Sequence, residues 1–166
     1  MFFRMVHAVL ALGRVELLHL GPPCASFPVA VSPPQRSPSE PYGLCTLSDK
    51  ARAKVEAGTH LILAAIELLT VQISVGNRGS LDQPERSQAQ WLQEFSGMLV
   101  HLNLVTSVCH YCASGMRWKK PTKFWHNWYP PDLFRKCPGG HSHRELRGTT
   151  KVKGKTVKWT SIASPY

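Results

Sequence analysis

The chain has 166 residues, 43% of them hydrophobic, so it can bury one domain core but is too short for two comfortable ones. Its formal net charge of +10 comes from its last third: residues 1–113 carry eight basic and eight acidic side chains, whereas residues 114–166 carry twelve and two. Such a basic segment predicts a polyanionic partner such as DNA or RNA. The competing interpretation is a solvated, partly disordered basic tail.

The cysteine and hydropathy patterns argue against a secreted or membrane protein. The chain has an odd number of cysteines, at positions 24, 45, 109, 112 and 137, which does not suit a disulfide framework. An intracellular, reducing location is expected, and the nucleus if the protein is eukaryotic and functional. No run reaches the ~18 to 20 apolar residues of a membrane span, so no membrane partner is expected. The apolar start lacks a clean cleavage site and is expected to be a helix feeding a buried strand rather than a signal peptide.

The first predicted elements are a helix over residues 5–12 and a strand over residues 14–20, which stops at Gly21 and two prolines. Residues 25–47 are rich in proline and serine, and they predict an extended surface loop. A loop of this length inside a compact domain is uncommon and often functional.

The later elements continue the alternation of helices and strands. In order, they are a helix over residues 48–70, a strand over 71–75, a turn over 77–80, a helix over 87–99 and a strand over 100–111. This order predicts an α/β fold over residues 1–113: a partial Rossmann-like, mainly parallel sheet with helices in a three-layer arrangement. Residues 114–166 are expected to be an irregular basic segment that packs on the same domain, with one or two late strands including residues 156–161.

A thiol stands where the first predicted strand ends. The strand runs into Gly21-Pro22-Pro23-Cys24, which puts Cys24 at the carboxyl edge of the sheet, where ligands of α/β folds bind. The prolines stiffen the loop, and a nucleophile benefits from geometry that is set before its substrate arrives. Taken alone, such a cysteine is more often structural, since reactivity also requires a lowered thiol pKa or a nearby cation.

Three segments together resemble the motifs of one family. Residues 18–27 (LHLGPPCASF), 80–84 (SLDQP) and 111–122 (YCASGMRWKKPT) are similar, in this order, to the Pro-Cys, Glu-Asn-Pro and Tyr-Gly…Lys-Pro-Thr motifs of cytosine-C5 DNA methyltransferases of the phage and mobile-element type. The resemblance runs from about residue 13 to 166 and includes His141, His143 and residues 160–165. The ordered set predicts common ancestry with that family.

The resemblance implies a role for each matched residue. Cys24 would add to C6 of a flipped-out cytosine, which makes C5 nucleophilic toward the methyl group of S-adenosylmethionine. Asp82 would replace the glutamate that holds the N3 and amino edge of the base. The residues expected to contact DNA phosphate or the target base are Arg117, Lys119, Lys120, Thr122 and Lys123.

Two departures reduce the activity that the resemblance implies. The cofactor motif Phe-x-Gly-x-Gly would lie upstream of residue 13, so this chain alone is not expected to bind S-adenosylmethionine, and a separate cofactor-binding half is a candidate partner. Asp82 is one methylene shorter than glutamate, and a ~1 Å misplacement can cost ~100-fold in rate. Gln83 in place of asparagine adds a second mismatch. We therefore expect a truncated or degenerate methyltransferase-like protein; the alternative is a non-catalytic basic nucleic-acid-binding or interaction module.

A set of cysteines and histidines has the residue types of a zinc site: Cys109, Cys112, Cys137, His141 and His143. Cys109 and Cys112 fall on a predicted strand, where residues three apart point to opposite faces, so chelation would require a turn at residues 110–111. Ordinary core and loop positions are the favoured interpretation, and no metal ligand is assigned.

Aromatic residues alternate with lysines in the basic segment. Trp118, Trp125, Trp128 and Tyr129 have the composition that stacks on bases and follows a nucleic-acid backbone. The alternative is that they cover the last strand of the sheet. This alternative is favoured for Trp118 and Trp159, whereas Trp125 and Trp128 are expected in a loop.

Overall fold

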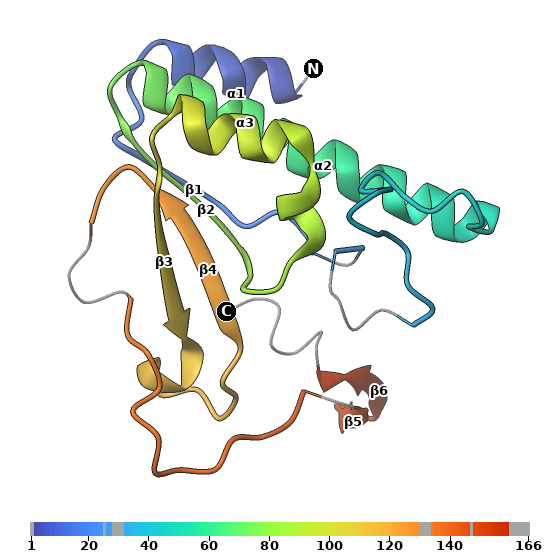
Figure 1. The fold of residues 1–166 in the computed structure, drawn as a ribbon. Coiled ribbons are helices and arrows are strands. Elements are labelled where there is room, and N and C mark those ends of the chain that lie inside the picture. The colour runs from blue at the N-terminus through green and yellow to red at the C-terminus, as the bar shows by residue number, and fades with distance from the viewer. Residues whose placement is uncertain (1, 25, 28–31, 130–133, 147, 160–166) are drawn as a thin grey trace.

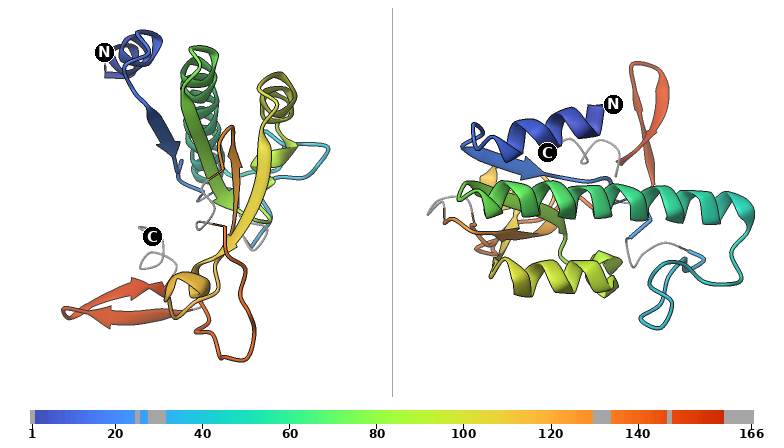
Figure 2. Two further views of the ribbon diagram at one scale, coloured as in Figure 1. Left: turned by 90° about the vertical axis from the view of Figure 1, so that its left-hand side faces the viewer. Right: turned by 90° about the horizontal axis from the view of Figure 1, so that it is seen from above.

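The computed structural model describes residues 2–24, 26–27, 32–129, 134–146 and 148–159. Within these residues the fold is mixed α/β: three helices lie side by side over one face of a four-stranded sheet, and a small hairpin follows (Figure 1). Viewed from above, the helices lie in front of the strands (Figure 2). The predicted three-layer arrangement is therefore wrong for the described part of the chain, where helices cover one face only.

The helices are α1 (Phe2–Ala11), α2 (Asp49–Ser74) and α3 (Gln93–His101), with short 3-10 turns η1 (Gln88–Trp91) and η2 (Tyr111–Ser114). The strands are β1 (Leu17–Leu20), β2 (Arg78–Pro84), β3 (Val105–His110), β4 (Pro121–His126), β5 (Thr149–Val152) and β6 (Lys155–Lys158). The predicted first helix and first strand correspond to α1 and β1. The late strand predicted over residues 156–161 corresponds to β6, and its last two residues lie outside the described residues.

The strand predicted over residues 71–75 is wrong, because this stretch continues α2 as far as Ser74. Gln72 explains the extension: it is fully buried, and its side-chain amide donates hydrogen bonds to the carbonyls of Val15 (2.6 Å) and Arg78 (3.0 Å). These tertiary contacts outweigh the strand propensity of the β-branched residues around it. The strand comes later, as β2, and it replaces the turn predicted over residues 77–80.

The strand predicted over residues 100–111 is too long at its start. Residues 100 and 101 still belong to α3, and β3 begins at Val105. Asn103, with φ of 47°, lies between these two elements in the left-handed region that asparagine tolerates better than most residues. The strand also ends one residue early, at His110, because residues 111–114 form η2.

The strand order in the sheet is β1-β2-β4-β3. β1 and β2 are parallel and are joined through α2, so they form a β-α-β unit. β4 pairs antiparallel with both β2 and β3, so the mainly parallel order that we predicted is wrong: one of the three pairings is parallel. β1, β2 and β3 nevertheless point in the same direction, and β4 is the reversed strand between the last two. β1 lies at the edge of the sheet and is not the buried strand that we expected.

The hydrophobic core fills the space between the helices and the sheet. It contains the apolar stripe of α2 together with side chains of β2, η1, α3 and β4. Trp125 of β4 is 1% exposed and packs edge-on against Phe95 of α3, with 4.7 Å between the ring centroids. Trp125 is therefore a core residue, not the loop residue that we expected, and its ring is not available to stack on a base. Trp118 is buried as expected.

A buried arginine holds the proline-rich loop against α2. Arg36 is 2% exposed, and its guanidinium contacts Phe27, with 4.1 Å to the ring centroid. It donates hydrogen bonds to oxygens of Ser26, Pro41, Val55 and Thr59. All of these acceptors are neutral, and burial lowers the pKa of Arg36 to about 10. Arg36 thus joins two separate parts of the loop, near Ser26 and near Pro41, to α2.

The same loop approaches α2 so closely that the helix requires a glycine. A Cβ atom on Gly58 would lie 2.1 Å from Ser26 Oγ and 3.3 Å from Ser26 Cβ. Glycine in a helix interior costs about 1 kcal/mol relative to alanine, so its presence here needs a reason. The packing of Ser26 on Gly58 provides that reason, and it brings the segment just after Cys24 onto α2.

By length and composition, α2 is one described helix that could cross a membrane. This evidence is weak, because the core helix of a soluble protein meets the same criterion. α2 contacts both neighbouring helices and the strands β1 and β2. The absence of a membrane partner stays a prediction.

Gly58→Ala is expected to lower the free energy of unfolding by about 1 kcal/mol or more, because the new methyl group would push Ser26 off the helix. Gly97→Ala in α3 is the matched control: its Cβ would meet nothing within 4 Å, so the better helix propensity of alanine should raise stability by up to about 1 kcal/mol. Urea unfolding followed by circular dichroism measures both effects. A stabilising effect of Gly58→Ala would contradict the packing of the loop on α2.

Candidate functional site

One edge of the sheet gathers residues from four separate segments. β1, β2 and β3 end at this edge and β4 begins there, since Pro84 pairs with Thr122 and His110 pairs with Pro121. Cys24 follows β1, and Asp82 lies near the end of β2, which is the parallel neighbour of β1. Ligands of α/β sheets bind outside the carboxyl ends of such strands. This edge is the candidate site.

The loop that carries Cys24 is tied to the end of β2. Gln83 is 1% exposed; its amide donates a 2.7 Å hydrogen bond to the carbonyl of Pro22, and its side-chain oxygen accepts one of 3.1 Å from Ser87 Oγ. The backbone of Gly21 passes beside Asp82: a Cβ atom there would lie 2.9 Å from Asp82 Oδ1. Gln83, which we expected to be a mismatch, is thus a structural anchor, and Gly21 leaves room for the carboxylate.

Cys24, Asp82 and Lys120 share one electrostatic environment. The Cys24 thiol is partly buried, and burial raises its pKa; the positive charge of Lys120 lowers it and the negative charge of Asp82 raises it. The net direction is upward, so the thiol is mostly protonated at neutral pH in the free protein. Of the two charges, Lys120 is the one that favours the reactive thiolate.

The carboxylate of Asp82 is paired with a histidine that sequence reasoning missed. Nε2 of His19 lies 3.2 Å from Asp82 Oδ1, and its Nδ1 lies 2.9 Å from Ser80 Oγ. His19 and Ser80 are register partners on the parallel strands β1 and β2, which places the imidazole over the same face of the sheet as Asp82. The contact fixes where the carboxylate points. In the sequence, His19 lies two residues before Gly21. This spacing places His19 near Asp82 only once the register of β1 and β2 is known.

Lys120 occupies a strained backbone position at the centre of the site. Its φ is 32°, in the left-handed region that non-glycine residues rarely adopt. Its ammonium group lies 4.6 Å from the centroid of the Tyr111 ring, and burial lowers its pKa, while the charges of Asp82 and Cys24 raise it. Lys120 is half-buried and its charge acts on the Cys24 thiol, so it belongs to the same site; its contact with DNA stays a prediction.

The other predicted nucleic-acid contacts separate into two groups. Arg117 and Lys119 are exposed, as a phosphate contact requires. Thr122 is 1% exposed, and its hydroxyl donates a hydrogen bond to the carbonyl of Lys120. In this conformation it supports the backbone of Lys120. Lys123 is on the helix side of the sheet, where its ammonium donates to Gln90 Oε1 at 3.0 Å. In this conformation both side chains make hydrogen bonds within the protein, and their contact with nucleic acid stays a prediction.

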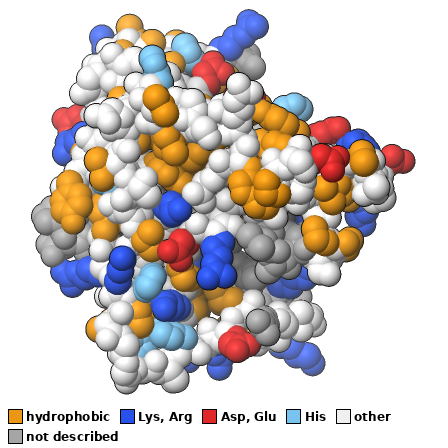
Figure 3. Space-filling model, viewed as in Figure 1, with side chains coloured by type: hydrophobic (Ala, Val, Ile, Leu, Met, Phe, Trp, Pro, Cys, Tyr) orange, Lys and Arg blue, Asp and Glu red, His pale blue; other side chains and the backbone are white. Residues whose placement is uncertain are grey.

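A basic hollow lies beside the site. Arg86, Lys119 and Lys136 line it, together with Glu85 and His110. Figure 3 shows Lys, Arg and His side chains gathered on the lower half of the visible face. Sequence reasoning missed Arg86, which follows the segment 80–84 by two residues, and Lys136, which is distant in the chain from the motif residues. Three cations around one hollow are a suitable surface for phosphate groups.

No protein-family model, curated protein or solved structure matches this chain at a significant level. The likeness to cytosine-C5 methyltransferases therefore depends on the ordered motifs and on where their residues lie. That geometry has three parts: Cys24 follows β1, Asp82 lies near the end of the parallel strand β2, and Lys120 directly precedes the reversed strand β4.

Proposed function

We propose that the chain is a cytosine-C5 DNA methyltransferase-like protein, in which the sheet edge accepts a flipped-out cytosine and Cys24 is the nucleophile. The observation that carries the proposal is that Cys24, Asp82 and Lys120, from three separate segments of the chain, lie at one sheet edge, where both charges act on the thiol. A nucleophile with two groups of opposite charge near it suits base activation.

Each group has a distinct part in this chemistry. The Cys24 thiolate adds to C6 of the base, and negative charge develops on the pyrimidine ring. Asp82, oriented by His19, holds the N3 and amino edge of the base. Lys120 favours the thiolate and offsets the charge that develops on addition. Because burial raises the pKa of Cys24, only a small fraction of the thiol is ionised at neutral pH, and this fraction limits the rate of addition.

The methyl donor requires a further structural element. β1 has a neighbour on one side only within the described residues, and α1 exposes Met5 and Val9, which lie about one turn apart on the helix. Leu12, just after α1, and Leu17 of β1 are exposed as well. Exposed apolar side chains and an open strand edge are features that another α/β element would cover. We propose that a cofactor-binding half docks there, and that this chain alone does not transfer methyl groups from S-adenosylmethionine.

A second candidate function is a non-catalytic nucleic-acid-binding module. The basic hollow of Arg86, Lys119 and Lys136 favours it, because those cations are present whether or not Cys24 reacts. Both candidates require binding to nucleic acid, and they differ in whether Cys24 forms a covalent adduct. Two experiments test these points separately: the first measures DNA binding, and the second measures the reaction of Cys24.

Binding of the chain to duplex DNA is expected to weaken steeply with salt, at a slope of log K against log[salt] near 0.9 for each phosphate contact. Arg86→Ala and Lys119→Ala should each reduce this slope by about 1, since each removes a contact from the hollow. Lys54→Ala, on α2 away from the hollow, is the control and should leave the slope unchanged. Fluorescence anisotropy over a salt series measures it. Affinity that does not vary with salt would count against both candidates.

Exchange at C5 tests whether Cys24 reacts. When the thiolate adds to C6, C5 takes a proton from water; when the adduct reverses, C5 can lose its original hydrogen as the C6–S bond breaks. Duplex DNA with tritium at cytosine C5 should therefore release tritium to water in the presence of the chain and without a methyl donor. Asp82→Ala should slow the release by about 100-fold.

Cys24→Ser is the control for this exchange, since the hydroxyl is a far weaker nucleophile than the thiolate. DNA binding combined with equal release by the wild type and by Cys24→Ser would reject the methyltransferase-like proposal and leave the binding module.

A further inference from the structure

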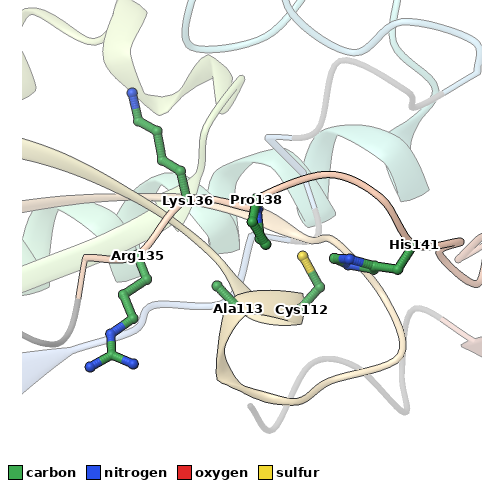
Figure 4. Close-up of a pocket in the computed structure, with 6 residues that line it drawn as sticks. All are labelled: Cys112, Ala113, Arg135, Lys136, Pro138 and His141. Atoms are coloured by element: carbon green, nitrogen blue, oxygen red, sulfur yellow. The ribbon is translucent and has the colours of Figure 1, made fainter.

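A cluster of two cysteines and two histidines lies outside the sheet-edge site, where η2 meets residues 134–146. It consists of Cys112, Cys137, His141 and His143, and one ligand atom from each lies within 4.8 Å of all the others. Figure 4 shows the sulfur of Cys112 and the imidazole of His141 on the same side of the hollow, next to Pro138. From these residues we propose that the chain binds one structural zinc ion.

The distances within the cluster suit a tetrahedral ion. Nε2 of His143 and Nε2 of His141 lie 3.4 and 3.7 Å from Cys137 Sγ. With Zn–S of about 2.3 Å and Zn–N of about 2.0 to 2.1 Å, a tetrahedral site separates sulfur and nitrogen by about 3.6 Å. The two observed distances lie on either side of this value. Four protein ligands of the Cys₂His₂ type close the coordination sphere, so the site is structural, not catalytic.

The local backbone explains why these cysteines meet and Cys109 does not take part. β3 ends at His110 and the 3-10 turn η2 carries Cys112 off the strand, away from Cys109. Cys109 remains buried on the strand. On the other side, Gly139 and Gly140 have φ of 81° and 73°, so the chain turns back and brings His141 to Cys137.

Hydrogen bonds around the cluster orient its ligand atoms. Nδ1 of His141 lies 3.0 Å from the carbonyl of Gly139, an acceptor that leaves Nε2 deprotonated and directed at the cluster. The backbone N–H of Gly139 donates to Cys137 Sγ at 3.4 Å, which fixes the position of the sulfur within the cluster.

The ion would fasten the basic segment to the end of β3. Two hydrogen bonds also make this connection, from His110 N to the Arg135 carbonyl and from Cys137 N to His110 Nδ1. Because residues 135–137 lead directly into the cluster, metal binding fixes Lys136 next to Lys119 in the basic hollow. This inference stands independently of the reaction proposed for Cys24.

The test uses the full chain, purified under reducing conditions and loaded with zinc sulfate. Elemental analysis should find about one zinc per chain, and the content should fall to background in Cys112→Ser, Cys137→Ser and His143→Ala. Cys45→Ser, which changes an exposed cysteine outside the cluster, is the matched control and should retain the ion. Cobalt(II) in place of zinc should give the intense visible bands of a tetrahedral ion with thiolate ligands.

Thiol protection keeps the inference testable if the ligand variants do not fold. In the zinc-loaded wild type, mass spectrometry after alkylation should find Cys112 and Cys137 protected, and a chelator should release both. Absence of zinc from the loaded wild type, zinc retained in folded Cys137→Ser, a cobalt spectrum typical of octahedral oxygen ligands, or no change in alkylation of these two cysteines with chelator would each overturn the assignment.

Discussion

The buried side chain of Gln83 sets the arrangement on which the candidate site depends. Its amide donates to Pro22 and accepts from Ser87, so it ties the loop after β1 to the end of β2 and to the segment that follows. Since β1 and β2 are parallel neighbours, a single polar side chain at their common end is enough to hold the thiol loop beside Asp82. Gln83 is 1% exposed, so leaving its buried amide without a partner would cost ~1 to 3 kcal/mol.

Cys24 is held from its other side by the packing of the long loop. The N–H of Phe27 donates to the carbonyl of Cys24, and the carbonyl of Phe27 accepts from Gln88. Arg36 then joins Ser26 and Phe27 to α2. The loop therefore has an anchor on each side of the thiol, and a nucleophile whose backbone is restricted in this way loses little freedom when a substrate binds.

The sequence was most informative where local signals decide structure. The first helix, the strand before Gly21 and the start of the long helix follow from apolar spacing and prolines. The position of Cys24 at the carboxyl edge of the sheet followed from the strand that stops at Gly21 and two prolines. The reversed strand β4 was missed, although one signal was present: the ten residues between β3 and β4 are too few for the crossover that a parallel pair needs.

Other features depend on contacts between distant residues and leave no local signal. His19 meets Asp82 only because β1 and β2 pair in one particular register. In the sequence, Trp125 lies near charged residues and resembles an aromatic residue of a loop. In the structure, β4 places it in the hydrophobic core. The separation of 25 positions between Cys112 and Cys137 carries no information about distance in space. Strand order and register, which are decided by packing over the whole domain, are what sequence patterns do not specify.

The central claim is that Cys24, Asp82 and Lys120 act on one another in a single site, and the alkylation rate of Cys24 measures this most directly. Asp82→Asn removes the charge that raises the thiol pKa and should speed alkylation, whereas Lys120→Met removes the charge that lowers it and should slow alkylation. Each change should be on the order of fivefold, the factor that corresponds to about 1 kcal/mol of charge interaction.

The rates are obtained by mass spectrometry after iodoacetamide treatment near pH 8, with the exposed Cys45 as internal reference and Lys123→Met as the matched control for Lys120→Met. Opposite shifts at Cys24, with Cys45 and the control unchanged, are the predicted result. Equal rates in all variants, or shifts of Cys24 in the same direction, would contradict the shared site.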